Sequence, residues 1–507
     1  MTDGNTAGRA PVRTSWIAAA AAAAWAVYLA VRVYYFWREN PAAIGDMAGA
    51  ADAARAAVAG FEPGKLLCHF ANLFFAAAVF AAASGPGEWL LRALRSMPAR
   101  PMGRALYSTA LGTGIVLSTV LFAGLAGALG RGAMLVLIGV AAALRAAAWA
   151  VPVRPVSMES GEKKMDETGR GAVCGDAGGE KYQGSAVSII EIIPALAAIC
   201  CLARAWTAAC VPVYDTDSLM YHLAVPKLYL DAGRIYYIPY MLHANWPFLA
   251  EMGYTFALAA GGAGPSGFFS PGGGEEFARM ISYCFALLAC AAVYRAGRQW
   301  GGGPAGGWFS LAVFGAIPLL HTQAGLTAAE TAVCLFEVLA VAAYVEWARG
   351  GGRGMFAVSA LCAGLALSCK LLPAVSVVIL MMCVAATVLR NGNGMKLSAG
   401  SAAAYGAIAA VFPLPWFIKS WVWTGNPVWP FFYSVFGGRN WNELVSRDYF
   451  HFIHSYYRMA EPGDTHNIFH LLTFNLYDWS AGFVVALALP FAVYGAVRLG
   501  RAVWFLA

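Results

Sequence analysis

Apolar stretches of about 20 residues recur along this chain, and they limit its fold more than any other feature. A helix that rises ~1.5 Å per residue needs roughly 20 apolar residues to cross the ~30 Å hydrocarbon core of a bilayer. Hydrophobic residues form 60% of the 507 residues and charged residues only 12%. Soluble proteins are closer to 45–50% apolar and about 25% charged. The sequence therefore predicts an all-α polytopic membrane protein.

Twelve stretches are apolar and long enough to be candidate spans: 15–37, 66–85, 106–129, 133–151, 188–210, 277–297, 304–323, 328–348, 355–369, 371–389, 398–422 and 481–499. The spans are expected to be helices, because barrel strands would give stretches of about ten residues with alternating polarity. Twelve spans place both termini on one side. If that side is the cytoplasm, the basic loops between spans satisfy the positive-inside rule. We therefore expect an inner-membrane protein with cytoplasmic termini, and no nucleic-acid partner despite the net charge of +7.

A polar linker at 152–187 separates a four-span region, 1–151, from the remaining spans, 188–507. Two long loops, 211–276 and 423–480, fall on the outer face in this topology. The apolar segment that begins at Phe248 is too short for a span, and it is expected to form an interfacial or re-entrant helix on the outer side.

The first outer loop contains the stretch "VYDTDSLMYHLAVPKLYLDAG", which concentrates titratable residues beside apolar spans. Asp217 is expected to open an amphipathic helix that runs to Asp231 and ends at Gly233. Its carboxylate could serve as an N-cap. It could also serve as a base, because the helix dipole would keep it ionised and oriented. Tyr221, four residues further on, would share its helical face.

Asp215 and Asp217 form a D-x-D pair, a spacing with which some transferases hold a divalent ion. Hard cations require several oxygen ligands, and the sequence offers few others nearby. We therefore expect no required cofactor. Whether a divalent metal binds at Asp215 and Asp217 is left open.

Four motifs resemble the GT-C superfamily of glycosyltransferases. The first loop carries an acidic residue, a Tyr four residues later, "HLAVPKLYLDAGRI" and then "NWPFLAE". Later motifs are "ALSCKLLPAVS" and "PWFIKSWVWTGNPVWPFF". Together they are most similar to the polyprenyl-phosphate-dependent family of protein O-mannosyltransferases and lipid A aminoarabinose transferases. The resemblance covers about 188–440, and the four N-terminal spans exceed the family core.

The resemblance implies a GT-C core of about 12 spans and a polyprenyl-phosphate sugar as donor, with a glycan, lipid or protein as acceptor. Asp217 would be the general base of an inverting transfer, and Glu330 would be the second acidic residue, where the family more often has Asp. Lys227 and Lys370 are the candidates to stabilise the departing lipid phosphate. The residues expected to shape the substrate pocket are Asp215, Tyr221, His222, His243, Asn245 and Glu251.

Two rival functions stay open. A lipid-linked sugar transporter or flippase would place coupling charges near the membrane midplane, whereas the expected spans contain few acidic residues. An oligosaccharide ligase would use the same outer face with a diphosphate carrier. We expect a membrane glycosyltransferase.

Overall fold

The computed structural model of the chain describes residues 63–151, 189–261, 273–300, 303–315 and 317–457. The chain divides into two compact units, Leu67–Thr465 and a second made of Met1–Leu66 with His466–Ala507. The described residues belong almost entirely to the first unit, which is the subject below. Every regular element among them is helical, which confirms the prediction of an all-α fold.

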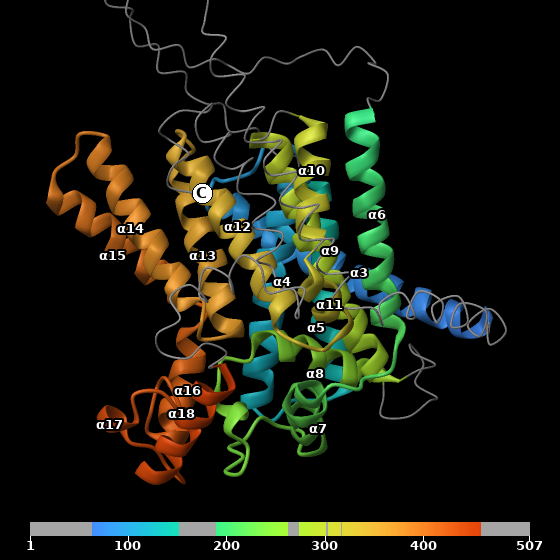
Figure 1. The fold of residues 1–507 in the computed structure, drawn as a ribbon, viewed down its shortest axis with the longest axis vertical. Coiled ribbons are helices and arrows are strands. Elements are labelled where there is room, and N and C mark those ends of the chain that lie inside the picture. Colours follow the sequence, from blue (N-terminus) through green and yellow to red (C-terminus); the bar gives the residue numbers. More distant parts are fainter. Residues whose placement is uncertain (1–62, 152–188, 262–272, 301–302, 316, 458–507) are drawn as a thin grey trace, which may run out of the picture. The chain divides into compact units, whose positions relative to one another are not determined.

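Among the residues that the structure describes, six helices are long and apolar enough to cross a membrane: α3 (Pro63–Ala93), α4 (Pro101–Leu125), α5 (Arg131–Ala150), α6 (Ile189–Cys210), α9 (Gly274–Trp300) and α12 (Glu330–Ala348). A seventh candidate is the pair α15 (Met395–Ala409) and α16 (Leu414–Thr424), which bends by 68° at a short break. These helices indicate a multi-pass membrane protein (Figure 1).

Other expected spans have a different form in the structure. The stretch 304–323 is divided into α10 (Pro304–Gly315) and α11 (Pro318–Gly325), because Pro318 holds the preceding Ile317 in extended backbone. The stretches 355–369 and 371–389 correspond to α13 (Arg353–Cys369) and α14 (Ala374–Arg390), each of 17 residues. The stretches 15–37 and 481–499 lie outside the described residues. The number of twelve spans therefore stays a prediction.

The linker 152–187 also lies outside the described residues. The helices on either side of it, α3 to α5 and α6 to α18 (Glu443–Tyr457), fall in the same compact unit. Helix α4 packs on α8 (Leu249–Gly261) and α9, and α12 packs on α9 and α13. Helix α8 has only 13 residues, which agrees with the expectation that it is not a full span.

Small residues bring the helices close together. A Cβ on Gly112 of α4 would collide with the Ala83 carbonyl of α3, so this crossing requires glycine. Between α3, α9 and α12, Phe80 meets Phe285 edge to face, and Phe285 meets Phe336 in the same way, with ring centroids 4.9 and 6.1 Å apart. Edge-to-face aromatic pairs add to the stabilisation from burial alone.

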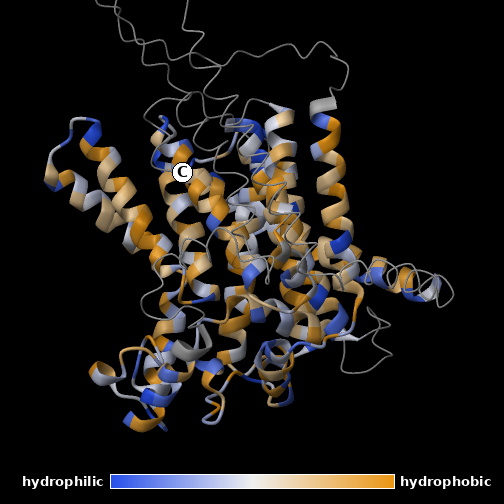
Figure 2. Ribbon diagram, in the orientation of Figure 1, coloured by the Kyte–Doolittle hydropathy of each residue, from blue (hydrophilic) through white to orange (hydrophobic). Residues whose placement is uncertain are grey.

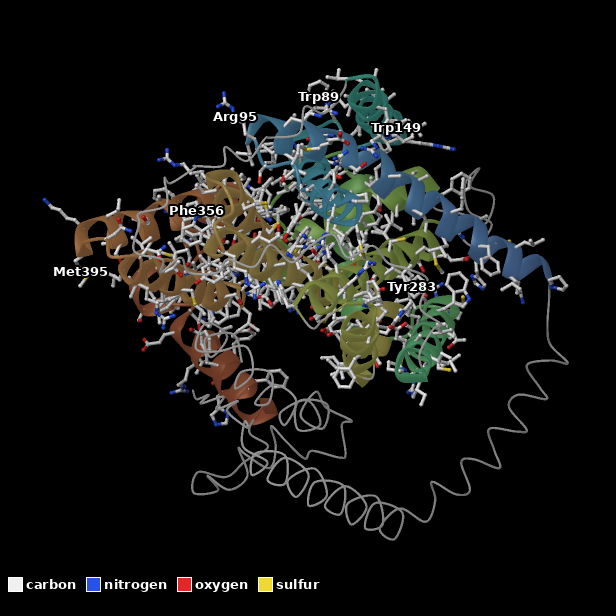
Figure 3. All side chains as sticks on the ribbon, turned by 90° about the horizontal axis from the view of Figure 1, so that it is seen from above. Trp89, Arg95, Trp149, Tyr283, Phe356 and Met395 are labelled. Carbon is white, nitrogen blue, oxygen red and sulfur yellow. The ribbon has the colours of Figure 1, made fainter. Side chains whose placement is uncertain are left out.

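Charged residues are concentrated at the helix ends. At one end Glu88 pairs with both Arg92 and Arg145, and Arg295 lies 2.5 Å from Glu346. Trp89 and Trp149 lie on one edge of the helices there, with Arg95 pointing away from them (Figure 3). In Figure 2 hydrophobic residues dominate the long helices, and hydrophilic residues gather toward their ends.

Candidate active site

The segment expected to form one helix from Asp217 to Asp231 is interrupted. It forms a π-helical turn, η1 (Ser218–His222), followed by α7 (Ala224–Asp231). Pro226 has no N–H to donate to the carbonyl of His222, so the regular hydrogen-bond ladder cannot run through this point. Gly233, at a φ of 64°, ends α7 as predicted, with Arg234 N bonded to Tyr229 O. Single π-helical turns occur frequently at functional sites.

An open pocket of about 280 Å³ lies between η1, α11 and the start of α12. Its lining residues are Asp215, Thr216, Asp217, His222, Gln323, Leu326, Ala328 and Glu330. Four of them were expected from the sequence to be site residues, although Glu330 is more than 100 positions from the others. The fold therefore joins the first loop to the head of α12.

The two carboxylates of the D-x-D pair have different roles. Asp215 Oδ2 accepts a hydrogen bond from Ser218 N at 2.8 Å, so Asp215 caps the turn. The exposed Asp217 side chain makes no capping bond with the described backbone, and its Oδ2 lies 3.4 Å from the Tyr221 hydroxyl. The capping role weighed for Asp217 belongs to Asp215, and the Asp217 carboxylate faces the pocket.

His222 is held from behind by a buried carboxylate. Its Nδ1 lies 2.6 Å from Oε1 of Glu251 on α8, and both side chains are 2% exposed. Such a pairing fixes the orientation of an imidazole ring and favours the proton on Nδ1. The opposite edge of the ring, with Nε2, is then the edge available to the pocket that His222 lines.

An aromatic cluster backs the Asp217 side of the pocket. His243, on the 3₁₀ turn η2 (Leu242–Asn245), stacks on Tyr221 with ring centroids 4.1 Å apart and planes 8° apart. Trp246 meets His243 edge to face at 4.5 Å. Burial lowers the pKa of His243 to about 4 against an opposing effect of Asp217, so the imidazole is neutral near pH 7. Burial first, and then Asp217, raise the pKa of Tyr221, which stays a neutral phenol.

The two candidate phosphate-binding lysines differ in position. Lys370, at the end of α13, donates to Glu330 Oε1 at the head of α12, and both side chains are about one-third exposed. This pair places a cation beside the pocket. Lys227 instead pairs with Glu275 at 2.5 Å on the surface, away from the residues that line the pocket.

The remaining predicted residue, Asn245, is buried at the end of η2, and its Oδ1 has no hydrogen-bond partner among the described residues. The described part of the chain also holds no group of three or more His, Cys, Asp or Glu placed to bind a metal ion. An ion between Asp215 and Asp217 would therefore take its remaining ligands from substrate oxygens or water.

Sequence reasoning missed Thr216 and Gln323 as lining residues. The available signal was the stretch "TQAGLTAAE", which ends at Glu330 and places polar side chains within a segment read as the edge of a span. The sequence does not predict that Gln323 lies near the first loop, because its position depends on how α11 packs on α6 and α9.

Comparisons of the chain with protein-family models, with curated proteins and with solved structures find no match. The class that the fold and the pocket define is that of a multi-pass helical membrane protein with an acidic pocket at the helix ends.

Proposed function

We propose that the protein is a membrane glycosyltransferase that moves a sugar from a polyprenyl-phosphate carrier to an acceptor hydroxyl at the outer face. The observation that carries the proposal is the Asp217 carboxylate. This carboxylate makes no capping hydrogen bond with the described backbone. It lines the same pocket as Glu330, which pairs with Lys370. A base for the acceptor hydroxyl and a cation for the departing phosphate are the groups that such a transfer needs.

In the proposed reaction Asp217 is the base and Lys370 is the cation. Asp217 accepts the proton of the acceptor hydroxyl. At the same time the oxygen of that hydroxyl forms a bond to the anomeric carbon of the donor sugar. The bond from that carbon to the phosphate oxygen breaks with inversion, and both electrons leave with the lipid phosphate. Lys370 stabilises the charge that develops on this phosphate once it exchanges Glu330 for the phosphate oxygens.

The polar lining of the pocket supports a hydroxyl-rich ligand. Asp215 Oδ1, Gln323 Oε1 and Glu330 Oε2 are buried oxygens without hydrogen-bond partners among the described residues. Leaving such acceptors unpaired costs about 1–3 kcal/mol each. A sugar, with a donor on nearly every carbon, is a ligand whose hydroxyls would satisfy this lining after small side-chain movements.

The test is transfer by membranes that contain the protein, supplied with a radiolabelled polyprenyl-phosphate sugar. Release of lipid phosphate together with labelled, lipid-free or acceptor-linked sugar supports the proposal. A Lys370→Met variant is expected to lower the rate by about 10²-fold, the scale of losing one preorganised donor. Wild-type membranes that bind the donor but never cleave it would reject the proposal.

One observation favours the rival function of transport. Glu337 lies within the candidate span α12, where its Oε1 accepts a 2.5 Å hydrogen bond from Ser376 of α14. Ionisable groups inside a span are costly and often mark a transport path. Proteoliposomes loaded with a fluorescent lipid-linked sugar separate the two functions: a transporter moves the intact lipid between leaflets, and Glu337→Gln stops this movement.

A further inference from the structure

Lys419, on α16, is a buried lysine that the proposed reaction does not use. Its side chain is only 5% exposed, and the described residues offer it no carboxylate within ion-pair distance. Its Nζ lies 4.9 Å from the ring centroid of Trp416 and 5.1 Å from that of Trp423. These indole faces provide cation–π contacts, which offset part of the large cost of taking an ammonium group out of water.

The Lys419 ammonium group makes one direct bond to another part of the fold. Its Nζ donates to the carbonyl oxygen of Ala244 at 2.7 Å, 175 positions away in the sequence. Ala244 is fully buried and lies between His243 and Asn245 on η2. Lys419 therefore holds the backbone of the turn that carries His243.

The turn η2 is short. It is four residues long, and the backbone bonds at its two ends include Ala244 N to Met241 O at 3.3 Å and Trp246 N to His243 O at 3.1 Å. The Tyr229 hydroxyl approaches the same Ala244 carbonyl at 3.5 Å. Since runs of 3₁₀ helix have poor hydrogen-bond geometry, side chains from α7 and α16 fix where η2 lies.

We propose that Lys419 is a positioning residue for the pocket. By holding Ala244 it keeps His243 stacked on Tyr221, and Tyr221 in turn lies against the Asp217 carboxylate. An apolar side chain would fill the same space at lower desolvation cost, but it could not donate this bond. The catalytic part of the inference rests on the proposed glycosyl transfer, whereas the link from Lys419 to η2 does not.

The test compares Lys419→Met with Lys419→Arg and with Lys396→Met, a control on the exposed side of α15. Lys419→Met is expected to keep or raise the melting temperature, because it removes a buried amine that is costly to take out of water. It is expected to lower kcat by up to about 100-fold, the scale of a 1 Å misplacement, with the donor KM changed less. Lys419→Arg, which keeps the charged donor, is expected to restore part of kcat, and Lys396→Met is expected to change neither quantity.

Hydrogen exchange of the peptide that covers 241–248 supplies a readout that needs no transfer activity. In Lys419→Met the amides of Ala244 and Trp246 are expected to exchange faster than in the wild type, while the core of α9 is unchanged. If the wild type transfers no sugar but this exchange increases, the proposed function fails and the link to η2 stands. Unchanged exchange and unchanged kcat in Lys419→Met would overturn the inference.

If Lys419→Met does not fold, Lys419→Leu gives the same comparison, because it also removes the N–H donor and fills the space with an apolar side chain. A parallel loss of melting temperature and kcat in both variants, with no partial restoration by Arg, would also overturn the inference, since Lys419 would then be only structural.

Discussion

The imidazole of His222 and the carboxylate of Glu251 form a buried pair at the rear of the pocket, 2.6 Å apart and each only 2% exposed. The pair joins η1 to α8, two segments that both belong to the first predicted outer loop. It also determines which edge of the His222 ring faces the pocket.

Replacing Glu251 by Gln is expected to lower stability by about 1–3 kcal/mol, the cost of weakening a buried charged hydrogen bond. The matched change Glu275→Gln breaks the surface pair with Lys227 and is expected to cost at most about 1 kcal/mol. Melting temperatures of the two variants in one detergent check the difference. Equal decreases in melting temperature would show that the buried pair stabilises the fold no more than the surface pair does.

His243 is expected to make stability depend on pH. Its pKa is lowered from 6.5 to about 4 by burial, so between these values the unfolded chain binds more protons than the folded one. The stabilising effect is complete above about pH 6.5 and is lost as the pH falls toward 4. The melting temperature of the wild type should therefore fall more between pH 7.5 and 5 than that of His243→Gln. Identical slopes in the wild type and in His243→Gln would contradict this assignment.

Asn426 is expected to hold the turn after α16. Its side chain donates to Phe431 O at 2.8 Å and to Gly437 O at 3.3 Å, and it accepts from Val428 N at 2.9 Å. Asn426→Ala loses three hydrogen bonds of about 1 kcal/mol each, so its free energy of unfolding should fall by on the order of 3 kcal/mol. The control Asn391→Ala, at an exposed helix end, should leave the free energy of unfolding close to that of the wild type. A melting temperature for Asn426→Ala equal to that of the control would contradict this role.

Chelation of divalent ions is expected to leave transfer unchanged. Asp215 already accepts a bond from Ser218 N, and the described residues add no third protein ligand to the D-x-D pair. Transfer rates with EDTA and with excess Mg²⁺ or Mn²⁺ test this expectation. A rate that EDTA abolishes and Mn²⁺ restores would place a substrate-completed metal site at Asp215 and Asp217.

The long helices were predictable because their signal is local. A run of apolar residues favours a long apolar helix whatever its neighbours are. Among the described residues, six of the twelve expected stretches are single long apolar helices. The end of α7 at Gly233 was equally local, since it needs only a positive φ. The π-helical turn was not predictable, because periodicity does not separate it from the α-helix around it.

The contacts between distant segments were beyond sequence reasoning. His69 lies 2.5 Å from Glu276, and Lys419 bonds to Ala244, across separations of 207 and 175 positions. Nothing near any of these residues predicts its partner. The site residues could be named because they are titratable or polar residues beside apolar stretches, but their pairing depends on how distant helices pack. Lys227 shows the difference, since it pairs with Glu275 away from the pocket.

The most direct measurement of the central claim is transfer from a polyprenyl-phosphate sugar by purified wild type, Asp217→Asn and Asp231→Asn at matched amounts of folded protein. Asp231 is the control, since it is an exposed carboxylate at the end of α7. Our account predicts that Asp217→Asn loses at least about 10²-fold in kcat, the lower range for a general base, and keeps donor binding and melting temperature, while Asp231→Asn transfers at the wild-type rate. Full transfer by Asp217→Asn would contradict the account.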